Sequence, residues 1–164
     1  MGEADAFTDT LRLELQEYGG MLDLLGKQQR GIIDRDPESL LEMNLSLELQ
    51  AEVCQAARKK RESFVRSAAG RFGLGDDIKA NELIPHFAEE FRPLLQALIE
   101  EIERLIETIQ NRARQNHMLL SRACELNQEL LHWLNPGAST TTYTKQGKHL
   151  GGPPATGLRF HNSA

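Results

Sequence analysis

The sequence contains few of the residues that build metal sites, disulfide bonds or an aromatic core. Aromatic residues make up 5% of the 164 residues, and the two cysteines, Cys54 and Cys124, lie far apart in the chain. Neither belongs to a Cys-x-x-Cys pair or a Cys/His cluster, so we expect two reduced thiols and no metal ligand. Leucine and isoleucine should therefore form most of the core.

The chain also lacks a surplus of positive charge and a long apolar run. Its net charge is −5, whereas general affinity for nucleic acid requires an excess of Lys and Arg. The N-terminal Met-Gly-Glu-Ala-Asp is acidic and does not resemble a signal peptide. No apolar run approaches the roughly 18–20 residues of a membrane-spanning helix. We therefore expect a cytoplasmic protein that neither binds nucleic acid nor inserts stably into a membrane.

The dominant pattern in the sequence is a long apolar stripe toward the C-terminus. From Leu94 to Leu134 there is no glycine and no proline, so the segment can form one uninterrupted helix. Positions spaced alternately by three and four residues mark one face of that helix. These positions are Leu95, Leu98, Ile102, Leu105, Ile109, Arg112, Asn116, Leu119, Ala123, Leu126, Leu130 and Trp133. The polar Arg112 and Asn116 should fix the register of helix packing at some cost in stability.

Two further helices should precede this one and form a hairpin. Asp36 can cap the second helix, and Pro37 suits its first position. Its predicted core face consists of Leu40, Met43, Leu47, Cys54, Ala57, Phe64 and Ala68. The first helix contains four glycines, so it should need packing to persist. A connector with a short helical turn near residues 81–84 should lead to the last helix, whose first turn includes Pro93.

These patterns predict an all-α fold, an elongated antiparallel three-helix bundle or coiled coil with a disordered C-terminal tail. The helices should cover about residues 5–33, 36–69 and 90–135. A helical domain over residues 1–135 would then be followed by a flexible tail over residues 136–164. That tail contains three basic residues and no acidic residue.

Candidate catalytic groups have simpler interpretations. Glu129 and His132 have the Glu-x-x-His spacing of di-iron bundles, but that site needs a second copy and two more glutamates. His117 lies on a helix, as in a phosphotransfer domain, yet bulky residues follow it. The basic run Arg58-Lys59-Lys60-Arg61 spreads around its helix and is interpreted as a solvated face. We predict no enzyme, no catalytic residue, no metal and no cofactor, and retain a phosphotransfer bundle as a minor hypothesis.

Residues 116–148 carry the more specific pattern. Asn116 to Leu120 reads Asn-His-Met-Leu-Leu, Glu129 to Leu134 reads Glu-Leu-Leu-His-Trp-Leu, and Thr142 to Lys148 reads Thr-Tyr-Thr-Lys-Gln-Gly-Lys. An Asn followed by a Leu-Leu pair on the last helix, and then a Tyr…Gly tail, resembles the FlgN family of flagellar type III export chaperones.

The resemblance implies a cytoplasmic chaperone that binds the C-terminal segments of the hook-associated proteins FlgK and FlgL. It also implies delivery of these clients to the export gate protein FlhA, with Tyr143 as the gate-docking residue. Client binding would map to Leu119, Leu120, Ala123, Leu126, Leu130, Trp133 and Leu134. The alternative is a self-assembling structural coiled coil, such as a homodimer, that buries the same stripe without delivering a client.

Overall fold

The computed structural model describes residues 2–75 and 77–134, and this part of the chain contains helices and their connections but no strand. The elements are α1 (Glu3–Asp34), α2 (Pro37–Phe72), α3 (Ala80–Leu83), the short 3-10 helix η1 (Ile84–His86) and α4 (Arg92–Leu134). The predicted all-α class is confirmed. The chain divides into two units, residues 1–120 and 121–164. The predicted tail, residues 136–164, lies outside the described residues.

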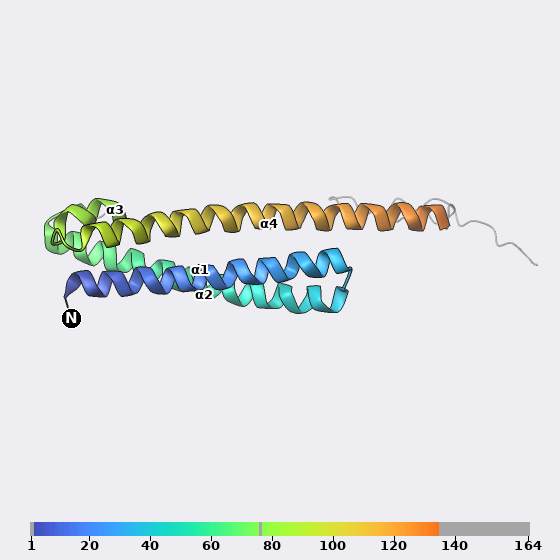
Figure 1. Cartoon of the computed structure of the whole chain (residues 1–164), viewed down its shortest axis with the longest axis horizontal. Coiled ribbons are helices and arrows are strands. Elements are labelled where there is room, and N and C mark those ends of the chain that lie inside the picture. The colour runs from blue at the N-terminus through green and yellow to red at the C-terminus, as the bar shows by residue number, and fades with distance from the viewer. Residues whose placement is uncertain (1, 76, 135–164) are drawn as a thin grey trace, which may run out of the picture. The chain divides into compact units, whose positions relative to one another are not determined.

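Helices α1 and α2 form the predicted antiparallel hairpin (Figure 1). The Asp36 side chain caps α2 by accepting a hydrogen bond from the backbone N–H of Ser39 at 3.1 Å. Arg35 adopts a left-handed conformation, with φ of 55°, and thereby reverses the chain between the helices. The short link between the two helices places them side by side, as predicted.

Two glycines of α1 allow α2 to approach closely. A Cβ atom at Gly20 would lie 3.2 Å from Nε2 of Gln50, and one at Gly31 would lie 3.3 Å from Cδ2 of Leu40. These distances are shorter than ordinary van der Waals contacts, so the Gln50 and Leu40 side chains would have to shift by a few tenths of an ångström to admit a Cβ atom. Helix α1, which its glycines would weaken in isolation, is thus packed closely against α2.

An aromatic cluster joins the start of α1, the end of α2 and the connector that follows it. The Phe7 ring, which is 0% exposed, stacks on Phe64 with centroids 4.9 Å apart and on Phe87 at 5.6 Å. Phe72 meets Phe87 edge-on at 5.8 Å. We call Phe7, Phe64, Phe72 and Phe87 the phenylalanine cluster. Buried leucines and isoleucines such as Leu11, Leu83 and Leu95 belong to the same core as this cluster.

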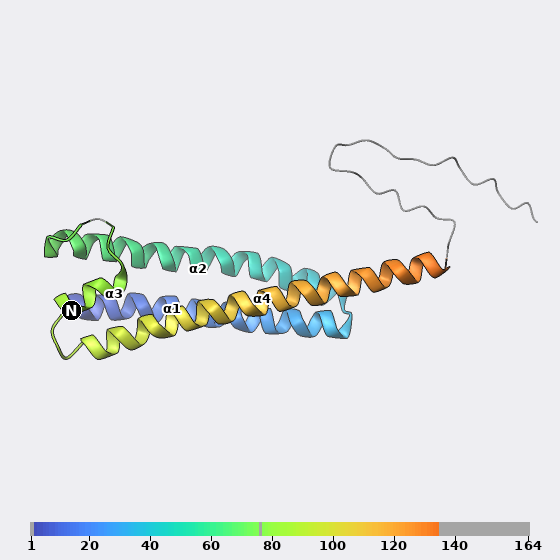
Figure 2. The same ribbon diagram turned by 90° about the horizontal axis from the view of Figure 1, so that it is seen from above.

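Helix α4 begins beside this cluster. Its first turn includes Pro93, as predicted, and Nε of Arg92 donates to the carbonyl oxygen of Phe87 at 2.9 Å. Leu95, Ile99 and Ile102 are buried against the hairpin. Within residues 1–120, α4 runs in the same direction as α1 and opposite to α2 (Figure 2).

A buried ion pair links the middle of α1 to α2. The Glu14 carboxylate is 0% exposed and accepts a hydrogen bond from Nε of Arg61 at 2.6 Å. The Tyr18 hydroxyl donates to the same carboxylate at 2.9 Å. Burial and the nearby negative charge of Glu14 raise the pKa of Tyr18. The Arg61 cation therefore compensates a carboxylate that would otherwise be buried without a counter-charge.

We predict that Arg61→Met lowers the free energy of unfolding by about 3–5 kcal/mol, because it leaves the buried Glu14 carboxylate without its cation. The matched control is Arg58→Met, three residues away on α2, since Arg58 pairs at 2.8 Å with the solvent-accessible Glu62. That control should change the free energy of unfolding by less than about 1 kcal/mol. Urea unfolding followed by circular dichroism measures both, and equal losses would contradict a specific role for the buried pair.

Candidate functional site

The burial of α4 changes at Asn116. Before it, Leu95 is 0% exposed and Ile102 is 3% exposed. After it, every described residue up to Leu134 is exposed except Ala123, which is half-buried. Large apolar side chains are among the exposed residues, with Leu130 at 57% and Trp133 at 84%. The stripe that is continuous in sequence thus contributes to the core only in its first half.

The client-binding positions implied by the resemblance all lie in this exposed half. Leu119 and Leu120 end the first unit, and the others belong to residues 121–134, the described part of the second unit. On a helix, Ala123, Leu126, Leu130, Trp133 and Leu134 share one side, because they recur at intervals of three and four residues. Met118 and Leu131 are also exposed apolar residues. The sequence pattern missed these two because they lie off the main stripe.

The polar interruption of the stripe contacts α1. Nδ2 of Asn116 donates to the carbonyl oxygen of Leu25 and to Oε1 of Gln28, both at 2.8 Å. Arg112 donates to Oε1 of Gln29 at 2.6 Å. These hydrogen bonds tie α4 to one register along α1, in agreement with the role expected for polar core positions. They also mark the end of the buried part of α4.

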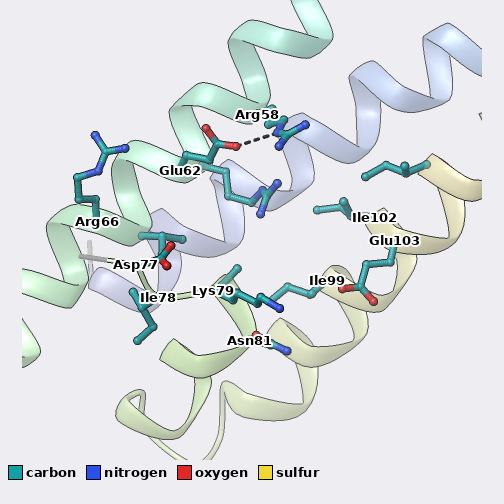
Figure 3. Close-up of a pocket in the computed structure, with 14 residues that line it drawn as sticks. Arg58, Glu62, Arg66, Asp77, Ile78, Lys79, Asn81, Ile99, Ile102 and Glu103 are labelled. Carbon is teal, nitrogen blue, oxygen red and sulfur yellow. Dashed lines mark hydrogen bonds and ion pairs between the residues drawn. The ribbon is translucent and has the colours of Figure 1, made fainter. Parts of the chain in front are cut away.

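A groove with a volume of about 650 Å³ lies between α2, α4 and residues 77–81 (Figure 3). Apolar residues of its lining include Val65, Ile99 and Ile102, whereas the charged residues carry both signs. The charged lining residues are Arg58, Arg61, Glu62, Arg66, Asp77, Lys79 and Glu103. Both cations and carboxylates line the groove, so it presents no single charge to a ligand. The described residues contain no group of three or more His, Cys, Asp or Glu side chains placed to hold a metal ion.

The basic run of α2 divides into residues with different roles. Arg58 pairs with Glu62 near the surface, and Lys59 and Lys60 are exposed. Arg61 instead reaches the buried Glu14. The interpretation of the whole run as a solvated face is therefore wrong for Arg61, because the helical period turns it toward α1.

The two cysteines have different surroundings. Cys54 is buried, and its thiol donates to the carbonyl oxygen of Glu17 at 3.4 Å. Burial raises the pKa of the Cys54 thiol, which favours the unreactive protonated form. Cys124 is exposed on α4. Both are free thiols.

The family model for FlgN, described as FlgN protein, matches residues 1–151. The chain belongs to the FlgN family. This is a family of flagellar export chaperones rather than enzymes, and its members interact with flagellar proteins. The match includes Tyr143, which lies outside the described residues. No curated protein and no solved structure gives a significant match. None of the described helices has the length and apolarity needed to cross a membrane.

We predict that the two halves of the stripe differ in their contribution to folding. Leu95→Ala should lower the free energy of unfolding by about 2–5 kcal/mol, because it leaves a cavity in the core. Leu130→Ala should change it by about 0.5 kcal/mol or less, because Leu130 is mostly exposed in the free protein. Urea unfolding of the two variants provides the comparison. A large loss for Leu130→Ala would mean that this side chain is part of the core.

Proposed function

We propose that this FlgN family chaperone works in the cytoplasm, where it binds the C-terminal helical segments of FlgK-like and FlgL-like hook-associated proteins and delivers them to the export gate protein FlhA. The helical domain, residues 1–135, would hold the client. The tail, residues 136–164, would contact the gate through Tyr143. The observation that carries this proposal is the exposed apolar row at the end of α4 in a member of a chaperone family.

The spacing of the exposed side chains suits a helical client. Leu126, Leu130 and Trp133 follow one another at intervals of four and three residues, so the apolar stripe of a second helix can lie along them. Met118, Leu119 and Leu120 are further exposed apolar residues, at the end of the first unit. Contiguous exposed apolar surface on a soluble protein commonly marks a site of protein interaction.

The energetics favour binding that can be reversed. Burial of apolar surface contributes roughly 25 cal/mol per Å². Ordering a client segment that is unfolded before it binds removes several kcal/mol of that gain. A chaperone that must release its client at the gate needs moderate affinity of this kind.

We predict that Leu126→Asp combined with Leu130→Asp abolishes co-purification with a FlgK-like C-terminal segment, because the two carboxylates would have to be desolvated in the complex. Circular dichroism should remain helical, since both positions are exposed. The control is Cys124→Asp combined with Gln128→Asp. It adds the same charge at the same spacing on the opposite side of the helix and should leave co-purification intact. Retention of the client by the leucine variant would refute the proposed binding face.

We predict that Tyr143→Ala weakens binding to the soluble domain of FlhA at least tenfold and leaves client binding unchanged. Aromatic side chains supply large apolar area at low entropic cost and are common anchors in interfaces. Tyr143→Phe should retain most of the affinity if the ring rather than the hydroxyl makes the contact. Titration calorimetry with client and gate measured separately would test this, and equal losses for both partners would refute separate sites.

A self-assembling coiled coil remains the alternative, because a second copy could cover the same exposed row of α4. Sedimentation equilibrium of the free protein separates the two hypotheses. A dimer that dissociates with Leu126→Asp and Leu130→Asp would favour self-assembly, and a monomer would favour an exposed row that is free for a client.

A further inference from the structure

A second row of exposed apolar side chains lies on the first half of α2, entirely within the first unit. Leu41, Leu45, Leu49 and Val53 are spaced by four residues and are 65%, 57%, 66% and 44% exposed. The predicted core face of α2 does not include them, and the function proposed for the end of α4 does not use them.

This row lies on the side of α2 that faces away from α1. The contacts between the two helices come from other positions: Asn44 accepts from Gln28 at 2.8 Å, Gln50 donates to the carbonyl oxygen of Glu17 at 2.9 Å, and Cys54 is buried beside it. With 100° of rotation per residue, these positions lie about 100–180° around the helix from Leu45 and Leu49. The hairpin is therefore complete without the exposed row.

The charge around the row has one sign. Between Asp36 and Ala57 the chain contains no Lys or Arg, and the first cation is Arg58. Four exposed glutamates share the face with the apolar row, namely Glu38, Glu42, Glu48 and Glu52. Among the described residues, none of these carboxylates forms an ion pair with Lys or Arg. We call the four apolar residues and the four glutamates the α2 face.

A second copy of the chain does not match the α2 face. If two such faces paired in register, or antiparallel about their own centre, the leucines would meet but the glutamates would lie opposite glutamates. If one copy shifted so that the basic half of α2, beginning at Arg58, faced the glutamates, the leucines would lie opposite Lys59, Ser63 and Ser67. None of these three arrangements satisfies both apolar contact and charge.

We propose that the α2 face docks a cationic amphipathic helix of another protein. That helix would place apolar residues at i, i+3 or i+4, and i+7 along Leu41, Leu45 and Leu49, with Lys or Arg on both sides to meet the glutamates. The negative charge of the face disfavours a phosphate backbone or an anionic lipid surface. Because the surface lies on α2, the chaperone could hold this partner and a client on α4 as separate ligands.

The test uses the full-length protein and a labelled synthetic helix of about 20 residues with leucines at helical spacing and lysines on both flanks. Fluorescence anisotropy should show binding that weakens as salt rises, because part of it is electrostatic. Leu45→Gln combined with Leu49→Gln should weaken binding at least tenfold while circular dichroism is unchanged, since both side chains are exposed.

Two charge-reversal variants test whether the glutamates of the α2 face attract the peptide. Glu42→Lys combined with Glu48→Lys should weaken the lysine-flanked peptide and create binding to a peptide with glutamates in place of the lysines. Glu100→Lys combined with Glu107→Lys makes the same change in net charge on exposed positions of α4 and should leave both peptides unaffected.

Four results would overturn the proposal. They are no binding of the lysine-flanked peptide, equal effects of the α2 and α4 charge reversals, equal binding by the leucine variant, and a dimer that Leu45→Gln and Leu49→Gln disperse. The last result would assign the face to self-association. The variant with Leu126→Asp and Leu130→Asp should bind the peptide as well as the parent does, so failure of the client proposal would be distinguishable from failure of this one.

Discussion

The stacking of Phe7 on Phe64 and Phe87 is the contact on which the rest of the first unit depends. It brings together the first turns of α1, the last turns of α2 and the connector, three segments that are distant in sequence. Because the connector is held there, Arg92 can bond to the carbonyl oxygen of Phe87, and α4 starts beside the hairpin. The direction of α4 along α1, and the burial of its first turns, follow from this anchor.

Most apolar residues of α4 that lie before Asn116 contribute to the core, whereas nearly all of those after it are exposed. The core contacts of α4 continue to the hydrogen bonds that Arg112 and Asn116 make with α1. Beyond them the helix continues without glycine or proline, and Arg122 pairs with Glu125 along its surface. Adding residues to an existing helix requires far less free energy than starting one. The end of α4 can therefore be helical and expose an apolar row, and it needs no separate core.

The sequence predicts the features that depend on local spacing, such as the cap at Asp36, the first turn around Pro93 and the polar contact that Asn116 makes in the helix packing. It does not predict the phenylalanine cluster, because stacking depends on where three distant segments meet in space. The sequence also does not predict that Arg61 points inward. Nothing in the basic run itself distinguishes Arg61 from its neighbours, because the distinction depends on its contact with the buried Glu14. For the candidate site, periodicity identified the row from Leu119 to Leu134, but only side-chain exposure distinguished it from core and revealed Leu41, Leu45 and Leu49 on α2.

Because α4 is buried only in its first half, its local stability should decrease along the helix. Near Leu95, breaking a backbone hydrogen bond requires disruption of the core, so amide exchange there should approach the rate set by global unfolding. Past Asn116 the exposed side chains add little tertiary resistance to opening, so exchange should become faster toward Leu134. Any ligand that covers the end of α4 would slow exchange at those amides, with little change at the amides around Leu95.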